Sequence, residues 1–474
     1  MTLLAAGHEA GVRQHRLGTP AWIRVCAGTA ILAALVLGLV LASATRDVRD
    51  GVDVIGHRTA PQVTATEDLY FVLADLDAQL ANVLLAGDDP ALGTTRTDAL
   101  KAYEERRAQA SADLQQATTV AGDDETAQHD VREIMTQAGR YQGLAAQAIA
   151  LNDREHNPAG RPSDAVLALH RQATDVMHGV LATAHELTEI NSVTLEHTYT
   201  DRAGATVTAR WWLVLLGLVL LGALIVLQVV LRVRLRRRVN VPVLVATAVA
   251  AWLTIGGVAL MASGAEHLRA AKHDAFDSLL ALRQARAVSY DANADESRYL
   301  IDPGRAAQYE KSFLDKSESL AGVGASAVTR YDDALATALD AYRADRSVRL
   351  KGFFGTELNN ITFPGEREAA ERTLATYQRY QLDDRIIRTK ARTDLRDAIA
   401  FCTSTSTGSS NYHFYAYDKE LAALIDINQR AFDQSISDAN AELNGWTGLI
   451  PYGGAALFVL LVVAGVWPRL AEYR

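Results

Sequence analysis

The chain has little of what most enzymes and disulfide-bonded secreted domains depend on. Its 474 residues include only two cysteines and ten prolines. The sequence contains no phosphate-binding P-loop, no Gly-rich dinucleotide fingerprint and none of the HExxH, CxxC or GxSxG patterns. Its twelve histidines are scattered. We therefore expect a protein that is not an enzyme and that holds no cofactor and no metal ion.

The two cysteines and the clustered polar residues predict no chemistry either. Cys26 lies in an apolar run and Cys402 in a polar segment, so no disulfide is expected. Two further sets are expected to face solvent: the histidines of one long helix and a dense charged patch. They are His170, His178, His185 and His197, and Asp383, Asp384, Arg385 and Arg388.

What the chain has instead is four long apolar runs. Each reaches the roughly 20 residues that cross a bilayer, and Arg24 is the one charged residue in them. Because intramembrane charges mark transport pathways, a channel or carrier is disfavoured. Ala42-Ser43-Ala44 is compatible with signal-peptide cleavage, but the length of the first run favours a retained span. The predicted spans are 21–44, 211–231, 242–262 and 448–467.

Charge sets the predicted orientation. The loop 232–241 contains Arg232, Arg234, Arg236, Arg237 and Arg238 and no acid, which makes it cytoplasmic by the positive-inside rule. Residues 44–208 hold 26 acidic against 13 basic side chains, and residues 263–447 hold 28 against 23. We expect both large segments to be extracytoplasmic, with the tails 1–20 and 468–474 in the cytoplasm of a multi-pass cell-membrane protein.

The two outer segments, 45–210 and 263–447, look like copies of one unit. Short matches recur in the same order in both, with offsets between 206 and 239 residues, and each segment is flanked by spans. The matched pairs are Asp77-Ala78-Gln79 with Asp291-Ala292-Asn293, Tyr103-Glu104 with Tyr309-Glu310, Arg140-Tyr141-Gln142 with Arg379-Tyr380-Gln381, and Glu189-Ile190-Asn191 with Asp426-Ile427-Asn428.

Helical periodicity runs through both segments. Leucines recur at spacings of three and four from Leu69 to Leu84, and no β-rich alternation is evident. The sequence predicts an all-α membrane protein with two tandem extracytoplasmic four-helix bundles. The predicted helices are 45–86, 95–120, 124–151 and 163–210 in the first segment, and 263–301, 304–325, 366–401 and 417–447 in the second.

The jump in offset predicts an inserted segment of about 33 residues, near 326–360, in the second half. It ends in a glycine-flanked aromatic pair, which is typical of an exposed docking tip. The alternative is that these rings pack back onto the bundle as a satellite core. The candidate contacts for an outer partner or ligand are Phe353, Phe354, Asn359, Asn360 and Phe363.

Two asparagines lie on packing stripes of the predicted helices. Asn191 precedes Leu195 by four residues, and Asn428 precedes Phe432 by four. A lone asparagine in a helical seam usually fixes register, and ligand recognition is the sharper alternative. Both join the candidate contacts.

Two resemblances give these features a functional context. Leu84-Leu85-Ala86-Gly87-Asp88 with Tyr103-Glu104 resembles the helix-turn-helix of CHASE3-type four-helix-bundle sensor domains, and Arg298-Tyr299-Leu300 with Tyr309-Glu310 is similar. The whole-chain plan resembles the GlnX family of actinobacterial membrane proteins. That resemblance implies coupling of an extracytoplasmic amino-acid-binding lipoprotein to a cytoplasmic Ser/Thr kinase, in glutamate/aspartate sensing.

The predicted cytoplasmic residues are too few for a folded enzyme. We therefore expect a signal relay that acts through a separate cytoplasmic protein, with the arginines of loop 232–241 as the contact. Membrane lipid is a further partner and nucleic acid is not. The alternatives are a direct small-molecule sensor or scaffold that partners a histidine kinase, and an accessory subunit of a transporter.

The topology is directly testable with reporter fusions. Fusions after residues 150 and 390 should report an extracytoplasmic location, and one at Arg236 a cytoplasmic location. A cytoplasmic signal from the fusion after residue 150 would overturn the orientation.

Overall fold

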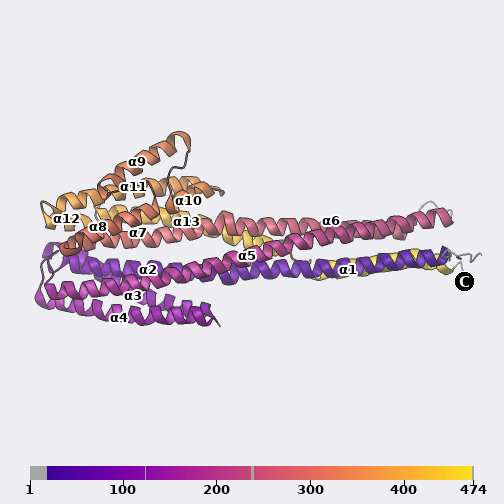
Figure 1. Cartoon of the computed structure of the whole chain (residues 1–474), viewed down its shortest axis with the longest axis horizontal. Helices are drawn as coiled ribbons and strands as arrows, with labels where there is room; N and C mark the ends of the chain where they lie inside the picture. Colours follow the sequence, from indigo (N-terminus) through magenta and orange to yellow (C-terminus); the bar gives the residue numbers. More distant parts are fainter. Residues whose placement is uncertain (1–18, 123, 236–239, 472–474) are drawn as a thin grey trace, which may run out of the picture. The chain divides into compact units, whose positions relative to one another are not determined.

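The computed structural model describes residues 19–122, 124–235 and 240–471. Within these ranges the chain has no β-strand, and its one β-bridge joins Gly322 to Lys351. The predicted all-α fold is confirmed. The helices, coloured along the chain in Figure 1, are α1 (Thr19–Val54), the π-helix η1 (Ile55–Thr59), α2 (Ala60–Ala86), η2 (Pro90–Leu92), α3 (Gly93–Ala121), α4 (Glu125–Glu155), α5 (Asp164–Leu235), α6 (Val241–Arg269), the π-helix η3 (Ala270–Phe276), α7 (Asp277–Ile301), η4 (Pro303–Arg305), α8 (Ala306–Leu320), α9 (Val328–Asp345), α10 (Gly352–Asn360), α11 (Glu366–Ala391), α12 (Leu395–Thr403), α13 (Ser410–Glu442) and α14 (Leu449–Ala471).

The helices form two compact units. The span unit holds the residues up to 50, those from 201 to 266 and those from 439 onward. The bundle unit holds residues 51–200 and 267–438. Most of both predicted outer segments belongs to this one compact unit.

The span unit carries the apolar surface of a membrane protein. Among the described residues, four helical stretches are long and apolar enough to cross a membrane: Ala21–Ala86, Asp164–Val233, Val241–Ile301 and Leu449–Pro468. Large apolar side chains point outward from the unit; Leu218 is 64% exposed and Ile255 is 68% exposed. Such a surface is costly in water and is at home in lipid.

Small and polar residues hold the span helices together. A Cβ added to Gly38 would lie 3.1 Å from the Ala455 side chain, so α1 and α14 approach closely there. The Thr45 hydroxyl donates to the Trp446 carbonyl at 2.8 Å, and the Asn240 amide donates to the Gly465 carbonyl at 2.9 Å. Close backbone approach and hydrogen bonds between helices are what stabilise packing in lipid.

Within the bundle unit, the first segment has the four predicted helices. The predicted leucine stripe of α2 is confirmed, because every leucine at its three- and four-residue spacing from Leu69 to Leu84 is buried. In the second segment the predicted helix 366–401 is two helices, α11 and α12. Asp394 begins α12 as its N-cap, accepting from the Asp397 backbone N–H at 3.1 Å.

The inserted segment of the second half is closed at its base by backbone pairing. Gly322 and Lys351 exchange two backbone hydrogen bonds of 3.1 and 3.0 Å. The excursion between them carries α9, and α10 follows after it. The insertion predicted near 326–360 overlaps this excursion and α10, and α10 packs against α7 and α8.

The two segments meet along α2 and α7, which lie side by side (Figure 1). Asp68 forms an ion pair with Arg283, and the Ser297 hydroxyl donates to the Asn82 side chain at 2.7 Å. Both pairs join positions 215 residues apart. A constant separation at two points means that α2 and α7 run parallel and in register.

A buried charge network crosses this α2–α7 contact. Arg298 is fully buried and binds Asp77 of α2 together with Asp291 and Asp295 of its own helix. Lys316 of α8 reaches the same two aspartates at 2.7 and 2.6 Å. Burial alone would raise the pKa of Asp291, but Lys316 and Arg298 hold it below its ordinary value.

Candidate functional site

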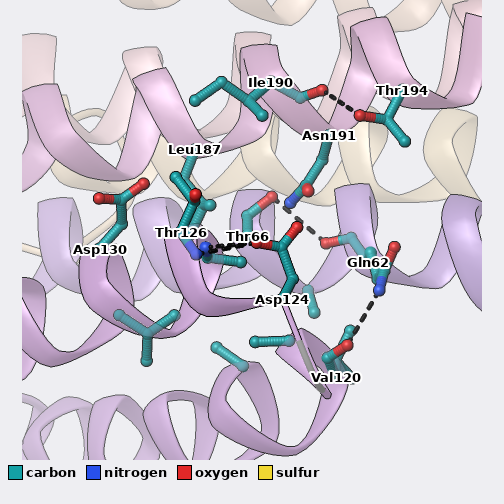
Figure 2. A pocket seen from close by; sticks show the side chains of 15 residues that line it. Gln62, Thr66, Val120, Asp124, Thr126, Asp130, Leu187, Ile190, Asn191 and Thr194 are labelled. Carbon is teal, nitrogen blue, oxygen red and sulfur yellow. Dashed lines mark hydrogen bonds between the residues drawn. The ribbon is translucent and has the colours of Figure 1, made fainter.

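A small pocket opens among α2, α3, α4 and α5 in the first segment of the bundle unit. Its volume is about 70 Å³. Apolar side chains line it from all four helices, and polar side chains reach it from α2, from α5 and from α4 with its N-cap (Figure 2). The apolar lining is Ala65, Ala117, Val120, Ala121, Ala127, Val131, Leu187 and Ile190, and the polar lining is Gln62, Thr66, Asp124, Thr126, Asp130, Asn191 and Thr194.

The turn between α3 and α4 shapes the mouth of this pocket. Gly122 ends α3 with φ +54°, a conformation that favours glycine. Asp124 then begins α4 as its N-cap, and its carboxylate accepts from the backbone N–H groups of Thr126 and Ala127 at 2.9 and 3.1 Å. The Gln62 amide donates to the Val120 carbonyl at 2.9 Å and ties the end of α3 to α2.

Asn191 is the predicted candidate that lines the pocket. It comes from α5, is half-buried, and its amide points into the pocket toward Asp124 (Figure 2). Deeper in, the Thr188 and Thr66 hydroxyls hydrogen-bond at 2.9 Å. Asn428 is not part of this pocket; it is fully buried on α13 in the second segment.

The size and charge of the pocket limit what it can hold. An engineered cavity of ~150 Å³ takes up benzene, so about half that volume suits only a very small molecule or one end of a larger one. The lining contains two carboxylates, Asp124 and Asp130, and no basic side chain. The pocket therefore favours a neutral or cationic group over an anion.

The inserted-segment candidates lie mainly in the fold. Phe354 is 2% exposed, and its ring packs against Tyr377 and Tyr417 with centroids 5.3 and 6.3 Å away. The Asn360 amide donates to the His273 carbonyl at 2.8 Å and to the Ser278 hydroxyl at 3.0 Å. The structure thus places Phe354 in the satellite core that the sequence left open as the alternative.

The remaining members of that set are more accessible. Phe353 and Phe363 are half-buried, and Asn359 is exposed. The Asn359 amide donates to the Gly355 carbonyl one turn back, at 2.7 Å. The aromatic pair is therefore split: Phe354 faces inward and Phe353 lies at the surface.

The cytoplasmic candidates lie at the end of α5 and beyond it. Arg232 is exposed. Arg234 belongs to α5, and Arg236, Arg237 and Arg238 lie outside the residues that the structure describes.

Of the two sets predicted to face solvent, the histidines are mainly accessible: His185 and His197 are exposed and His178 is half-buried. Four members of the two sets are buried instead. His170 is fully buried on α5, and burial lowers its pKa to about 4. Asp383, Asp384 and Arg388 are also buried, while Arg385 remains partly exposed. The three α11 charges are buried with ion-pair partners, whereas neither ring nitrogen of His170 has a hydrogen-bond partner among the described residues.

The partners of the α11 charges show what sequence spacing alone cannot. Asp383 accepts from His413 of α13 at 2.6 Å, and Asp384 binds Arg388 at 2.8 Å. The Arg388 guanidinium also lies 4.4 Å from the centroid of the Tyr299 ring on α7. A dense run of opposite charges on one helix is a weak signal, since it is equally typical of a solvated face.

Comparison with known proteins assigns a role to the segment that contains the pocket. Residues 51–200 match a family model described as the actinobacterial sensor domain, which covers less than half of the chain. No curated protein matches the chain. The match supports a sensor role and includes every residue that lines the pocket of Figure 2.

The two phenylalanines of α10 offer a matched test of the core assignment. Phe354→Ala removes a buried ring and should cost about 3–5 kcal/mol of unfolding free energy. Phe353→Ala removes a half-buried ring and should cost roughly 1 kcal/mol or less. Thermal unfolding of the full chain in detergent measures both. Equal, small losses for the two variants would mean that Phe354 is not core.

Proposed function

We propose that the chain is a non-enzymatic transmembrane signal relay, which couples an extracytoplasmic event at the bundle unit to a cytoplasmic Ser/Thr kinase. One observation carries the proposal. Three of the four candidate spans continue into bundle-unit sequence without a helix end: Ala21–Ala86, Asp164–Val233 and Val241–Ile301. A continuous helix transmits a shift or rotation from one end to the other.

The π-helical segments add a means of small movement. The π-helices η1 and η3 each join a span helix to a bundle helix, and they begin 215 residues apart, at Ile55 and Ala270. π-Bulges are common at functional sites, because their extra residue allows a helix to change register. In η3, Lys272 is nearly buried and binds Glu196 of α5 at 2.8 Å, linking two of the continuous helices.

The nature of the input follows from the pocket and from the resemblance to GlnX proteins. That resemblance implies glutamate or aspartate as the signal, and both are anions at neutral pH. A pocket with Asp124, Asp130 and no basic lining residue is a poor direct receptor for them. We therefore favour sensing through a binding lipoprotein that docks on the bundle unit.

A second candidate function is direct sensing of a small neutral or cationic molecule. The Asn191 side chain favours it, because the amide faces the pocket and makes no hydrogen bond among the described residues. An unpaired amide beside an acidic N-cap offers both a donor and acceptors to a ligand.

The kinase contact is tested at the arginine loop. Replacing Arg236, Arg237 and Arg238 with Gln, while retaining Arg232 and Arg234 to hold topology, should abolish recruitment of the kinase to membranes. Recruitment by the unaltered chain should weaken as salt rises, since exposed charges carry it. The readout is Ser/Thr kinase recovered on membrane vesicles that contain the chain.

A matched control changes the same number of charges on the bundle unit. Arg132, Arg154 and Arg161 are exposed there, and their replacement with Gln should leave recruitment unchanged. Recruitment that is equal for the loop variant and the unaltered chain, at low and high salt, would mean that the loop is only a topology signal.

A further inference from the structure

A second polar site lies in the second segment, where α7, α10, α11 and α13 meet. Glu357 of α10 is 1% exposed, and Glu366 of α11 and Asn428 of α13 are fully buried. Glu357 lies close enough to Glu366, Asn428 and Ser278 for each of them to affect its pKa. Two carboxyl groups and an amide thus share one closed space within the bundle unit.

When both glutamates are ionised, several buried oxygens of this cluster have no hydrogen-bond donor. One Glu366 oxygen accepts from the backbone N–H groups of Thr362 and Phe363 at 2.7 and 2.9 Å. The other Glu366 oxygen, both Glu357 oxygens and the Asn428 side-chain oxygen have no donor among the described residues. Buried acceptors without donors are costly, and two adjacent buried negative charges are more so.

Lys351, the residue before α10, is exposed, and the basic side chains of η3 are bound to other acids. On α7 and η3, Lys272 binds Glu196 and Asp277, and His273 also binds Asp277. Asp274 pairs with Arg269.

On the other elements packed on α10, Lys316 of α8 is bound to Asp291 and Asp295, and Arg367 of α11 donates to the Tyr342 hydroxyl at 3.0 Å. Glu318 of α8 accepts from the backbone N–H groups of Val323, Gly324 and Ala325. From α13, Asn428 is the polar side chain within reach of Glu357, and from α11 it is Glu366.

We propose that Glu357 and Glu366 form a proton-binding site, in which one proton shared by the two carboxyl groups holds α10 against α11 and α7. A proton on Glu357 gives a donor to the unpaired Glu366 oxygen. Ser278 already accepts from the Asn360 amide at 3.0 Å, so its own hydrogen is free for the second Glu357 oxygen. One proton therefore supplies the donor that the unpaired Glu366 oxygen lacks.

The pH window follows from the environment of the pair. Burial, and then the neighbouring Glu366, raise the pKa of Glu357 to about 8 from its ordinary 4.5. Between these two values the unfolded chain releases the proton and the folded chain keeps it, so stability falls as pH rises through this window. Near and above pH 8 the folded chain also loses the proton, and repulsion between the carboxylates loosens α10.

In the repeat alignment, residues of this site are the counterparts of residues that line the pocket of the first segment. Tyr141 and Tyr380 are 239 residues apart, and the same separation makes pocket-lining Ala127 the counterpart of Glu366. Asn191, which also lines the pocket, is the counterpart of Asn428. The first segment leaves open a space that the second fills with carboxyl groups. The inferred input, extracytoplasmic pH, goes beyond the proposed relay function and does not require the kinase contact.

The test compares Glu357→Gln with the unaltered full chain. Glutamine is the neutral isostere of the protonated acid and donates to Glu366 at every pH. Melting temperatures in detergent should coincide near pH 5 and separate toward pH 8.5, with the variant higher. Other buried acids also titrate in this range; burial raises the pKa of Glu67 to about 7. These acids are present in both proteins, so the difference between Glu357→Gln and the unaltered chain reports on Glu357.

Two further arms make the result decisive. Glu368 is exposed on α11, the helix that carries Glu366, and Glu368→Gln should follow the pH profile of the unaltered chain. Glu366→Gln should also make the melting temperature less dependent on pH. It tests the proposal if Glu357→Gln does not fold. Identical pH profiles for the unaltered chain and the glutamine variants would overturn the proposal. So would stabilisation of the unaltered chain by millimolar Ca²⁺ that Glu357→Gln abolishes, since the pair would then be a cation site.

Discussion

The bundle unit depends on one buried interaction, the ion pair between Arg298 of α7 and Asp77 of α2. Both side chains are fully buried. A charge that has lost its water must keep its partner, so each helix can occupy only the position that satisfies the other. Because Arg298 also binds Asp291 and Asp295, and Lys316 binds the same two aspartates, the constraint extends to α8.

The same interaction sets the relation between the two segments of the chain. The Arg298–Asp77 ion pair joins α2 and α7, which run parallel. Two further pairs, Asp68–Arg283 and Asn82–Ser297, each join positions 215 residues apart. Such pairing is what equivalent helices make across a two-fold axis in a dimer of identical subunits. The α2–α7 contact thus resembles a dimer contact that is made within one chain.

Hydropathy and periodicity predicted the parts of the structure that rest on apolar burial. The four spans and the leucine stripe from Leu69 to Leu84 follow from the length and spacing of apolar residues, which are local properties of the sequence.

What the sequence did not predict are partnerships between distant polar residues. Arg298, His170 and Asp384 carry no local mark that separates a buried charge from a solvated one, because only the fold shows which helices face them. Asn191 could be placed in a pocket-lining position by its spacing, whereas the role of Glu357 depends on Glu366 and Asn428 being brought to it. Phe353 and Phe354 were predicted together as a docking tip, but the Phe354 ring packs in the core beside Tyr377, a contact that the sequence alone does not show.

The central claim is that Arg298 and Asp77 hold the two segments together, and a double-mutant cycle measures it most directly. Asp77→Asn, Arg298→Gln and the double variant would be compared with the unaltered chain by unfolding in detergent. The account predicts that Arg298→Gln costs at least about 3 kcal/mol, because it leaves the buried Asp77 charge without its partner. Asp77→Asn should cost less, because Arg298 keeps Asp291 and Asp295. It also predicts a coupling energy of roughly 1–3 kcal/mol between the two positions. Strictly additive losses, with no coupling, would contradict it.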